Sequence, residues 1–430
     1  MDRESLFWPH ERLVRRTLWR VNSGVMPTIA ILGTLDTKGV EHGFVADLIR
    51  QRGHQTLVID VGALAAPTLK PDITREEVAR EGGIDLPALV AKRDRGEMVA
   101  AMAGAAAKVV ARLAAEMKID GIISLGGGGG TTIGTTAMRA LPIGFPKVMV
   151  STLASGDTSP FVGSRDIVMI PSVVDVAGIN RISRPILARA AGAICGMVET
   201  QVPTGEDKPL IAASMFGNTN DCVSAARKIL EAAGYEVLVF HATGTGGRTM
   251  ESLIESGMIS GVLDVTTTEW ADELVGGILG AGQTRLEAAG KTGTPAVVAP
   301  GCIDMVNFGP RATVPAKFAD RKFYQHNPNV TLMRLTKEES AQLGEIFATK
   351  LNAYTGPVTV LLPQKGFSVI GEPGKPFHDP FADEAFFQAL KHHLKKSVPV
   401  VEMDCPVNAP EFARACAEAL LKNIATGTTK

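Results

Sequence analysis

The chain has 430 residues, of which 45% are hydrophobic and 21% are charged, and its formal net charge is −1. This length indicates two or three domains, and the composition is sufficient for a large buried core. The near-neutral charge gives no broad basic field, and no uncharged apolar run of about 18 residues occurs, so neither nucleic acid nor a membrane is a predicted partner.

The five cysteines are odd in number, scattered and without a C-x-x-C pair. This usage indicates a reducing compartment, so we expect a cytoplasmic protein with neither a disulfide framework nor a zinc site. The eight histidines form no cluster with ligand-like spacing. The identity of any bound metal therefore stays open.

Residues 1–26 differ in composition from the rest of the chain. Two tryptophans and four arginines crowd between Trp8 and Arg20. The segment has no apolar core of the kind that a secretory signal needs. We interpret it as an N-terminal extension and assign no function to it.

The next residues alternate between strand and helix patterns. A strand over Thr28–Gly33, a polar loop over Gly33–Gly39, a helix over Glu41–Arg52 and a strand over Thr56–Asp60 form a predicted βαβ unit. Such a unit pairs its strands in parallel through a right-handed crossover.

Five consecutive glycines, Gly126–Gly130, form the most distinctive stretch of the chain. They follow a buried-strand run, Gly121–Leu125, and precede a predicted helix over Thr131–Ala140. Glycine permits positive φ and leaves backbone amides open to a ligand, and a helix N-terminus carries partial positive charge. This order predicts a site for a phosphate or carboxylate. The alternative is a flexible turn, and the stretch matches neither the dinucleotide fingerprint nor the P-loop.

Other segments of the first half are less specific. Residues 63–95 contain three prolines and are predicted to be irregular, with a lid over a cleft as one interpretation. A long alanine-rich helix is predicted over residues 96–117, and strands over residues 147–152 and 166–170. Residues 176–199 have a helical pattern that Pro185 is expected to break.

The second half repeats features of the first half after a linker-like stretch at residues 203–207. Pro209–Ala212 corresponds to Pro27–Ala30, and Ile259–Asp264 corresponds to Ile119–Ser124. We therefore predict an α/β fold with two Rossmann-like domains, over residues 27–203 and 208–430, that have mainly parallel sheets and are related by an internal repeat. In the second half, residues 266–272 stand where the first half has the glycine loop, so we expect the two halves to have different functions.

Together these motifs resemble the Tm-1-like ATP-binding domain family, which includes the tomato mosaic virus resistance protein and whose bacterial members form an uncharacterised protein family. The motifs are I-x-x-L-G-T-L-D-T-K-G at Ile29–Gly39, S-L-G-G-G-G-G-T-T at Ser124–Thr132, F-H-A-T-G-x-G-G-x-x-M-E at Phe240–Glu251, P-G-x-x-D-M-V-N-F at Pro300–Phe308 and L-P-x-x-G-x-S at Leu362–Ser368. The resemblance covers residues 27–425. It implies two Rossmann-like domains, ATP bound by the N-terminal domain, and a homodimer.

Ligands of open α/β sheets bind at the carboxyl ends of the strands. Lys38 can donate to a phosphate there, and Asp60 can bind a ribose hydroxyl or, equally, cap a turn. The threonines after the glycines can bind a ligand or cap a helix, and the 155–157 turn can reach a phosphate or Mg²⁺ or be a plain turn. The predicted nucleotide-binding residues are Gly33, Thr34, Asp36, Thr37, Lys38, Asp60, Gly126, Gly127, Gly128, Gly129, Gly130, Thr131, Thr132, Ser155, Gly156 and Asp157.

Candidates for catalysis lie in the second half. His241 at a strand end is followed by a glycine turn and by Arg248 and Glu251 on a predicted helix. His241 can act as a general acid or base, and Arg248 can clamp a carboxylate or phosphate. Arg248 and Glu251 can alternatively form a surface ion pair. Glu269 and Asp304 are further candidates.

Three functions fit these residues. The first is an ATP-dependent enzyme of small-molecule metabolism, a transferase or hydrolase-like enzyme, with ATP and Mg²⁺ on the glycine loop and a small anionic substrate against the second domain. The second is a nucleotide-gated binding or regulatory protein without turnover, which the lack of a known catalytic motif favours. The third is an NAD(P)-dependent dehydrogenase related to iron-type alcohol dehydrogenases, which would need a metal-binding histidine set that the sequence lacks.

Overall fold

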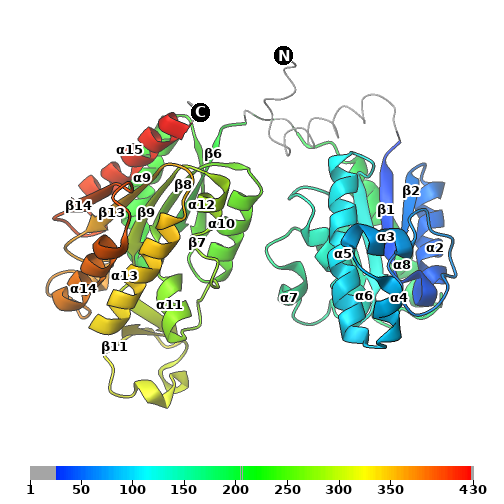
Figure 1. Cartoon of the computed structure of the whole chain (residues 1–430), viewed down its shortest axis with the longest axis horizontal. Helices are drawn as coiled ribbons and strands as arrows, with labels where there is room; N and C mark the ends of the chain where they lie inside the picture. Colours follow the sequence, from blue (N-terminus) through cyan, green and yellow to red (C-terminus); the bar gives the residue numbers. More distant parts are fainter. Residues whose placement is uncertain (1–25, 204, 206, 428–430) are drawn as a thin grey trace. The chain divides into compact units, whose positions relative to one another are not determined.

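The computed structural model describes residues 26–203, 205 and 207–427. The predicted N-terminal extension lies outside these residues, apart from Met26. The chain divides into two compact units, residues 1–204 and residues 205–430, which are described separately below. Each unit contains a parallel sheet with helices on both faces, as Figure 1 shows.

The first unit alternates strands and helices along the chain. Its elements are β1 (Thr28–Gly33), α2 (Leu35–Gln51), β2 (Gln55–Asp60), α3 (Arg75–Gly82), α4 (Leu86–Ala91), α5 (Arg95–Ala115), β3 (Gly121–Gly126), α6 (Gly128–Arg139), β4 (Lys147–Ser151), α7 (Ser159–Val162), β5 (Val168–Pro171) and α8 (Ser183–Glu199).

The strands of this unit pair in parallel in the order β2-β1-β3-β4-β5. The three central strands are almost wholly buried, as expected for a sheet covered on both faces. One apolar core packs α3, α5 and α6 against one face, and another packs α2 and α8 against the opposite face. The strand order reverses between β1 and β3, and ligands of such sheets bind at the carboxyl ends of the two strands there.

Four predicted boundaries in this unit differ from the structure. A first helical turn of α2 begins at Leu35, inside the predicted loop, where the buried carboxylate of Asp60 accepts a hydrogen bond from the Leu35 N–H (3.1 Å). The non-helical backbone of Lys38 (φ −132°, ψ 22°) separates this turn from the rest of α2, which agrees with the helix predicted from Glu41. Residues 63–95 are not irregular but contain α3 and α4, which start at the side-chain caps Thr74 and Asp85.

The other two errors concern α6 and α8. Helix α6 begins at Gly128, so the last three of the five glycines belong to its first turn. Helix α8 begins only at Ser183, and Pro185 lies in its first turn, where a backbone N–H has no intrahelical acceptor. The proline therefore does not break the helix.

Helix α5 is long and apolar enough to cross a membrane by length and composition alone. Half of that apolar window is buried inside the unit, where Met102, Ala106 and Val109 join the core. The core helix of a water-exposed domain meets the same two criteria.

The second unit has a six-stranded parallel sheet in the order β14-β13-β9-β8-β6-β7. Its helices and main-sheet strands are β6 (Leu210–Met215), α9 (Asn220–Ala232), β7 (Glu236–His241), α10 (Thr245–Glu255), β8 (Ile259–Thr266), α11 (Glu269–Val275), α12 (Ala288–Thr292), β9 (Ala296–Gly301), α13 (Lys337–Asn352), β13 (Val358–Pro363), α14 (Pro380–His393), β14 (Val400–Met403) and α15 (Pro410–Gly427).

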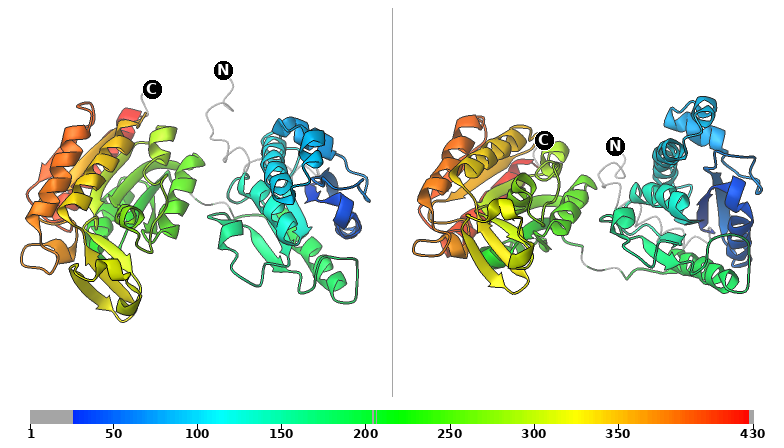
Figure 2. Two further views of the ribbon diagram at one scale, coloured as in Figure 1. Left: turned by 60° about the horizontal axis from the view of Figure 1, so that its bottom comes forward. Right: turned by 90° about the horizontal axis from the view of Figure 1, so that it is seen from below.

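A small antiparallel sheet is inserted between β9 and β13. It pairs β10 (Met305–Phe308), β12 (Val330–Arg334) and β11 (Phe323–Asn327), and Figure 2 shows it in yellow, apart from the main sheet. The order β7-β6-β8 in this unit matches β2-β1-β3 in the first unit. The predicted α/β fold, with two mainly parallel sheets and an internal repeat, is therefore confirmed.

Candidate functional site

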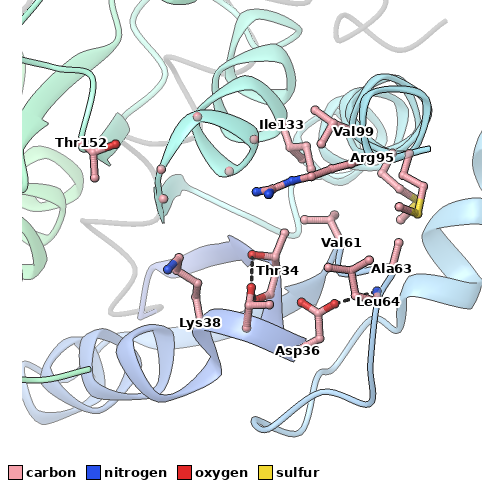
Figure 3. A pocket seen from close by; sticks show the side chains of 18 of the residues that line it. Thr34, Asp36, Lys38, Val61, Ala63, Leu64, Arg95, Val99, Ile133 and Thr152 are labelled. Carbon is pink, nitrogen blue, oxygen red and sulfur yellow. Dashed lines mark hydrogen bonds between the residues drawn. The ribbon is translucent and has the colours of Figure 1, made fainter. Parts of the chain in front are cut away.

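A cavity of about 380 Å³ opens at the carboxyl ends of β1 and β3, where the strand order of the first unit reverses. Figure 3 shows it between the start of α2 and the start of α6. It is lined by Thr34, Asp36, Thr37, Lys38, Val61, Ala63, Leu64, Arg95, Met98, Val99, Met102, Gly126, Gly127, Gly128, Gly129, Gly130, Ile133, Thr152 and Asp175.

The start of α6 presents unpaired amides to this cavity. The first hydrogen bond of the helix runs from the Thr131 N–H to the Gly127 carbonyl (2.8 Å), and no side chain caps the helix. Within the described chain, no acceptor bonds to the backbone N–H of Gly128, Gly129 or Gly130. The first turn also contains no acidic residue. Open amides and the helix dipole together favour an anion at this position.

The glycines are needed for close approach and not for a left-handed backbone. None of the five takes a positive φ, so that part of the sequence argument is wrong. A Cβ on Gly126 would lie 2.8 Å from the Cα of Gly130, which ties Gly126 to the tight strand-to-helix turn. A Cβ on Gly128 would meet nothing within 4 Å. Gly128 lines the cavity and is exposed, so a side chain at this position has open space.

The loop after β1 forms the opposite wall. The hydroxyls of Thr34 and Thr37 lie 3.1 Å apart, and the Lys38 Nζ donates to the carbonyl of Val176. Asp36 accepts hydrogen bonds at Oδ2 from Leu64 N (2.8 Å) and from the next amide, whereas its Oδ1 has no partner. Four of the residues predicted from this loop thus line one cavity with the glycines.

Asp60 and Gly33 do not line the cavity. The Asp60 carboxylate is buried, and its Oδ1 accepts from Leu35 N (3.1 Å) and Gly62 N (2.8 Å). Burial raises the pKa of Asp60, while these two backbone bonds act in the opposite direction. The bond to Gly62 is the turn-capping arrangement that the sequence left open. A Cβ on Gly33 would lie 2.1 Å from the His42 ring, so Gly33 serves packing.

The remaining predicted residues of the first unit also lie outside the cavity lining. Thr131 is buried with its hydroxyl 2.6 Å from that of Ser151, and the Thr132 hydroxyl donates to the Gly128 carbonyl (3.0 Å). Neither threonine caps the helix start. Asp157 accepts from Ser159 N (2.9 Å) in an exposed turn with Ser155 and Gly156, and from this region Thr152 reaches the cavity instead.

Sequence reasoning missed two charged residues, Arg95 and Asp175, and the apolar wall. Arg95, Met98, Val99 and Met102 all line the cavity from α5. Their spacing of three, four and seven residues places them on one helix face. The sequence alone could have indicated this wall, because Arg95 begins a helix face that is otherwise apolar.

The catalytic candidates of the second unit are divided between interior and surface. Arg285 is 1% exposed, and its guanidinium donates to Glu269 (2.8 Å), Glu251 (3.0 Å) and Asp264 (2.7 Å). Glu269 also accepts from the amides of Gly244 (2.7 Å) and Gly247 (3.0 Å).

Glu251 is held just as firmly, since it accepts hydrogen bonds from the amides of Leu286 and Ala288, both at 2.8 Å. Burial raises its pKa, against the attraction of Arg285. The predicted surface pair of Arg248 with Glu251 is therefore wrong. Arg248 donates instead to the Gly280 carbonyl (3.0 Å) and the Thr245 hydroxyl (3.2 Å).

Asp304 is buried too, with its Oδ2 accepting from the Ser368 hydroxyl (2.7 Å), and burial raises its pKa. His241 is exposed at the end of β7 and stacks on Phe216 with 5.4 Å between ring centroids. Of the five catalytic candidates, only His241 and Arg248 are therefore open to a ligand in this conformation. Among the described residues, no group of three or more His, Cys, Asp or Glu side chains is arranged to hold a metal ion.

Comparison with known proteins identifies the family. The model of the uncharacterised protein family UPF0261 matches the chain with its N-terminal domain at residues 27–203 and its C-terminal domain at residues 208–424. The chain belongs to this family. The UPF0261 protein of Clostridium tetani is 53% identical over 395 residues, which cover 91% of this chain and 98% of that protein.

The resemblance to tomato Tm-1 is confirmed at the level of sequence. The ToMV resistance protein Tm-1(GCR237) of Solanum lycopersicum is 41% identical to this UPF0261 chain over 336 residues, which cover 76% of the chain and 45% of the tomato protein. A putative UDP-N-acetylglucosamine 2-epimerase from Listeria monocytogenes is a distant structural neighbour, with 12% identity, a TM-score of 0.22, and coverage of 64% of this chain and 79% of that one. A TM-score this low supports no functional conclusion.

Proposed function

We propose that this UPF0261 protein binds ATP in the cavity of its first unit. The observation that carries the proposal is the uncapped start of α6, where three amides lack a protein acceptor. A Cβ on Gly128 would meet no atom within 4 Å, so the space beside these amides is open. A polyphosphate supplies the acceptors and the negative charge that this helix start lacks. The cavity volume of about 380 Å³ lies in the range of small-molecule sites.

The other lining residues fit the remaining parts of a nucleotide. Lys38 lies opposite the glycines and can exchange the Val176 carbonyl for a phosphate oxygen. Asp36 also lines the cavity, but its Oδ2 accepts from two amides and its unpartnered Oδ1 is buried, so the carboxylate would have to turn toward the cavity to bind a ribose hydroxyl or Mg²⁺ carried by the phosphates. Bound ATP would supply a phosphoryl group, and the residues named here would orient it.

The proposal includes a small anionic substrate that is recognised by the second unit. Arg248 and His241 are the exposed residues that could act on this substrate. Arg248 would bind a carboxylate or phosphate, and His241 would donate or accept a proton. One observation favours the alternative of a nucleotide-gated protein without turnover: Glu251, Glu269 and Asp304 are buried in the second unit and hydrogen-bonded to other protein groups. Incubation with ATP, Mg²⁺ and small carboxylates separates the two, because only the enzyme releases ADP.

The binding proposal is tested by Gly128→Leu, measured by calorimetry with ATP and Mg²⁺. The new side chain has free space in the folded protein and fills the anion position, so ATP affinity should fall by more than about 100-fold, or about 3 kcal/mol, with little loss of stability. Gly104→Leu is the matched control, because Gly104 is also helical, exposed and without atoms near its Cβ position. Unchanged ATP affinity in Gly128→Leu would remove the assignment.

A further inference from the structure

The cavity of the first unit has two chemically different ends. Figure 3 shows Lys38 and Thr152 at one end, near the start of α6, and Val61, Ala63, Leu64 and Val99 at the other. Met98, Met102 and Ile133 extend the apolar end. A nucleotide has the same polarity, with charged phosphates at one end and a flat, largely apolar base at the other. The phosphates therefore belong at α6 and the base at the apolar end.

The apolar end has little means of telling one base from another. Its side chains come from the loop after β2 and from α5 and α6, and they are all apolar. Sites that hydrogen-bond a substrate group reject analogues by about 10⁴- to 10⁵-fold, whereas apolar pockets discriminate by about 10- to 200-fold. The nearest carboxylate, Asp36, stands between the two ends, where a nucleotide carries the ribose that ATP and GTP share.

Arg95 lies between the ends and points toward the phosphate position. It is the first residue of α5, and its exposed side chain makes no hydrogen bond or ion pair to any described residue. Its Nη2 lies 4.0 Å from the position of a Cβ on Gly129, which places the guanidinium beside the unpaired amides. A guanidinium presents a planar fork of donors that matches phosphate oxygens.

We propose that this cavity selects its nucleotide by the number of phosphates, read by Arg95 together with the amides of α6, and not by the identity of the base. The inference rests on the proposed nucleotide binding and adds the property that the site recognises. Asp175 also lines the cavity, but its Oδ1 accepts the Val176 N–H (2.8 Å) and so is engaged within its own loop. Arg95 is a specificity-determining residue under this proposal.

The test is calorimetry on the full chain with ATP, GTP, ADP and AMP, each with Mg²⁺. The wild-type protein should bind ATP and GTP with affinities within about tenfold of one another, and AMP at least about 100-fold more weakly than ATP. Because a charged hydrogen-bond pair contributes about 10- to 100-fold in affinity, Arg95→Gln should weaken ATP by that factor and leave AMP nearly unchanged. Arg95→Lys, which keeps the charge but loses the fork, should lie between them.

Arg189→Gln provides the control, because Arg189 is an exposed arginine on α8, which covers the opposite face of the sheet, and its loss changes the net charge equally. Thermal melting checks that each variant folds. A preference of more than 100-fold for ATP over GTP, or equal weakening of ATP and AMP by Arg95→Gln, would overturn this inference while nucleotide binding still stands. If none of the four nucleotides binds the wild-type protein, the proposed function itself fails.

Discussion

Replacing Arg285 by methionine removes the cation that three buried carboxylates of the second unit share. The guanidinium donates to Glu269, Glu251 and Asp264 at 2.8, 3.0 and 2.7 Å. Methionine keeps an unbranched apolar chain in place of the arginine stem, so the change mainly removes charge and hydrogen bonds. The variant therefore measures how strongly the unit depends on this ion-pair cluster.

The carboxylates would be left in unequal positions. Glu251 and Glu269 would each retain backbone amide donors, whereas Asp264 would retain the Ser214 hydroxyl (2.7 Å). Removing one member of a buried ion pair costs about 3–5 kcal/mol, because the remaining charge is left uncompensated. A domain is stable by only about 5–15 kcal/mol. We therefore expect the second unit to lose about 3–5 kcal/mol of its free energy of unfolding.

Urea titration of the full chain, followed by tryptophan fluorescence, measures this loss. Trp270 reports on the site, since its indole N–H donates to the Arg285 carbonyl (3.2 Å). With a slope of about 1–3 kcal/mol per molar urea, the midpoint should fall by at least about 1 M. Arg227→Met serves as the control, because Arg227 forms an exposed pair with Glu231, and such pairs contribute about 0–1 kcal/mol.

A second substitution in the same background makes the reasoning refutable. Asp264→Asn neutralises the least satisfied carboxylate, so the double variant should recover part of the stability that Arg285→Met loses. A loss below about 1 kcal/mol in Arg285→Met would mean that the three carboxylates are not ionised around the arginine, and the account of the cluster would be wrong.

Two further predictions concern titration and packing. Burial raises the pKa of Asp272 from 3.8 to about 7. The folded protein thus holds a proton that unfolding releases, so this contribution to stability is complete below about pH 4 and is lost as the pH rises through 7. At about 1.4 kcal/mol per pKa unit the effect is at most about 4 kcal/mol. Asp272→Asn should flatten the pH dependence of the urea midpoint, because an amide does not titrate; an unchanged slope contradicts this. The variant should fold, because the Asn307 side chain can exchange its amide N and O positions so that its unpaired Oδ1 accepts from the new amide. Gly33→Ala should destabilise the first unit by about 1–3 kcal/mol, because its Cβ would overlap the His42 ring, whereas Gly104→Ala should not; equal melting temperatures would refute the packing role.

The sequence predicts the fold well because its signals are local. Buried strands and the repeated order of motifs were enough for two parallel α/β units. The helices α3 and α4 are also marked locally, since Thr74 and Glu77 form a capping box and Asp85 is a cap residue, but the three prolines of residues 63–95 favour irregular structure in a reading of the sequence alone.

The sequence-based predictions fail where a residue distant along the chain determines a helix boundary or the role of a side chain. The start of α2 depends on Asp60, 25 residues away, and no local cap marks it. The roles of Glu251 and Glu269 depend on Arg285, which lies 34 and 16 residues further along the chain. Spacing along one helix could suggest a pair between Arg248 and Glu251, but it could not reveal a competing partner that folding brings into the core.

The repeated fold also explains why only one half is expected to hold a polyanion. In the first unit the helix after the third strand, α6, starts with Gly128 and leaves its amides open. In the second unit the helix at the equivalent place, α11, starts with Glu269, whose carboxylate accepts from two amides at the start of the neighbouring α10. The protein thus supplies its own anion there, and Arg285 fixes it in place. A phosphate at that point would meet like charge and occupied donors. A carboxylate from the chain and a phosphate from a ligand are alternative ways to satisfy helix-start amides. The second unit uses the carboxylate of Glu269 at the start of α10, and we propose a ligand phosphate for the start of α6.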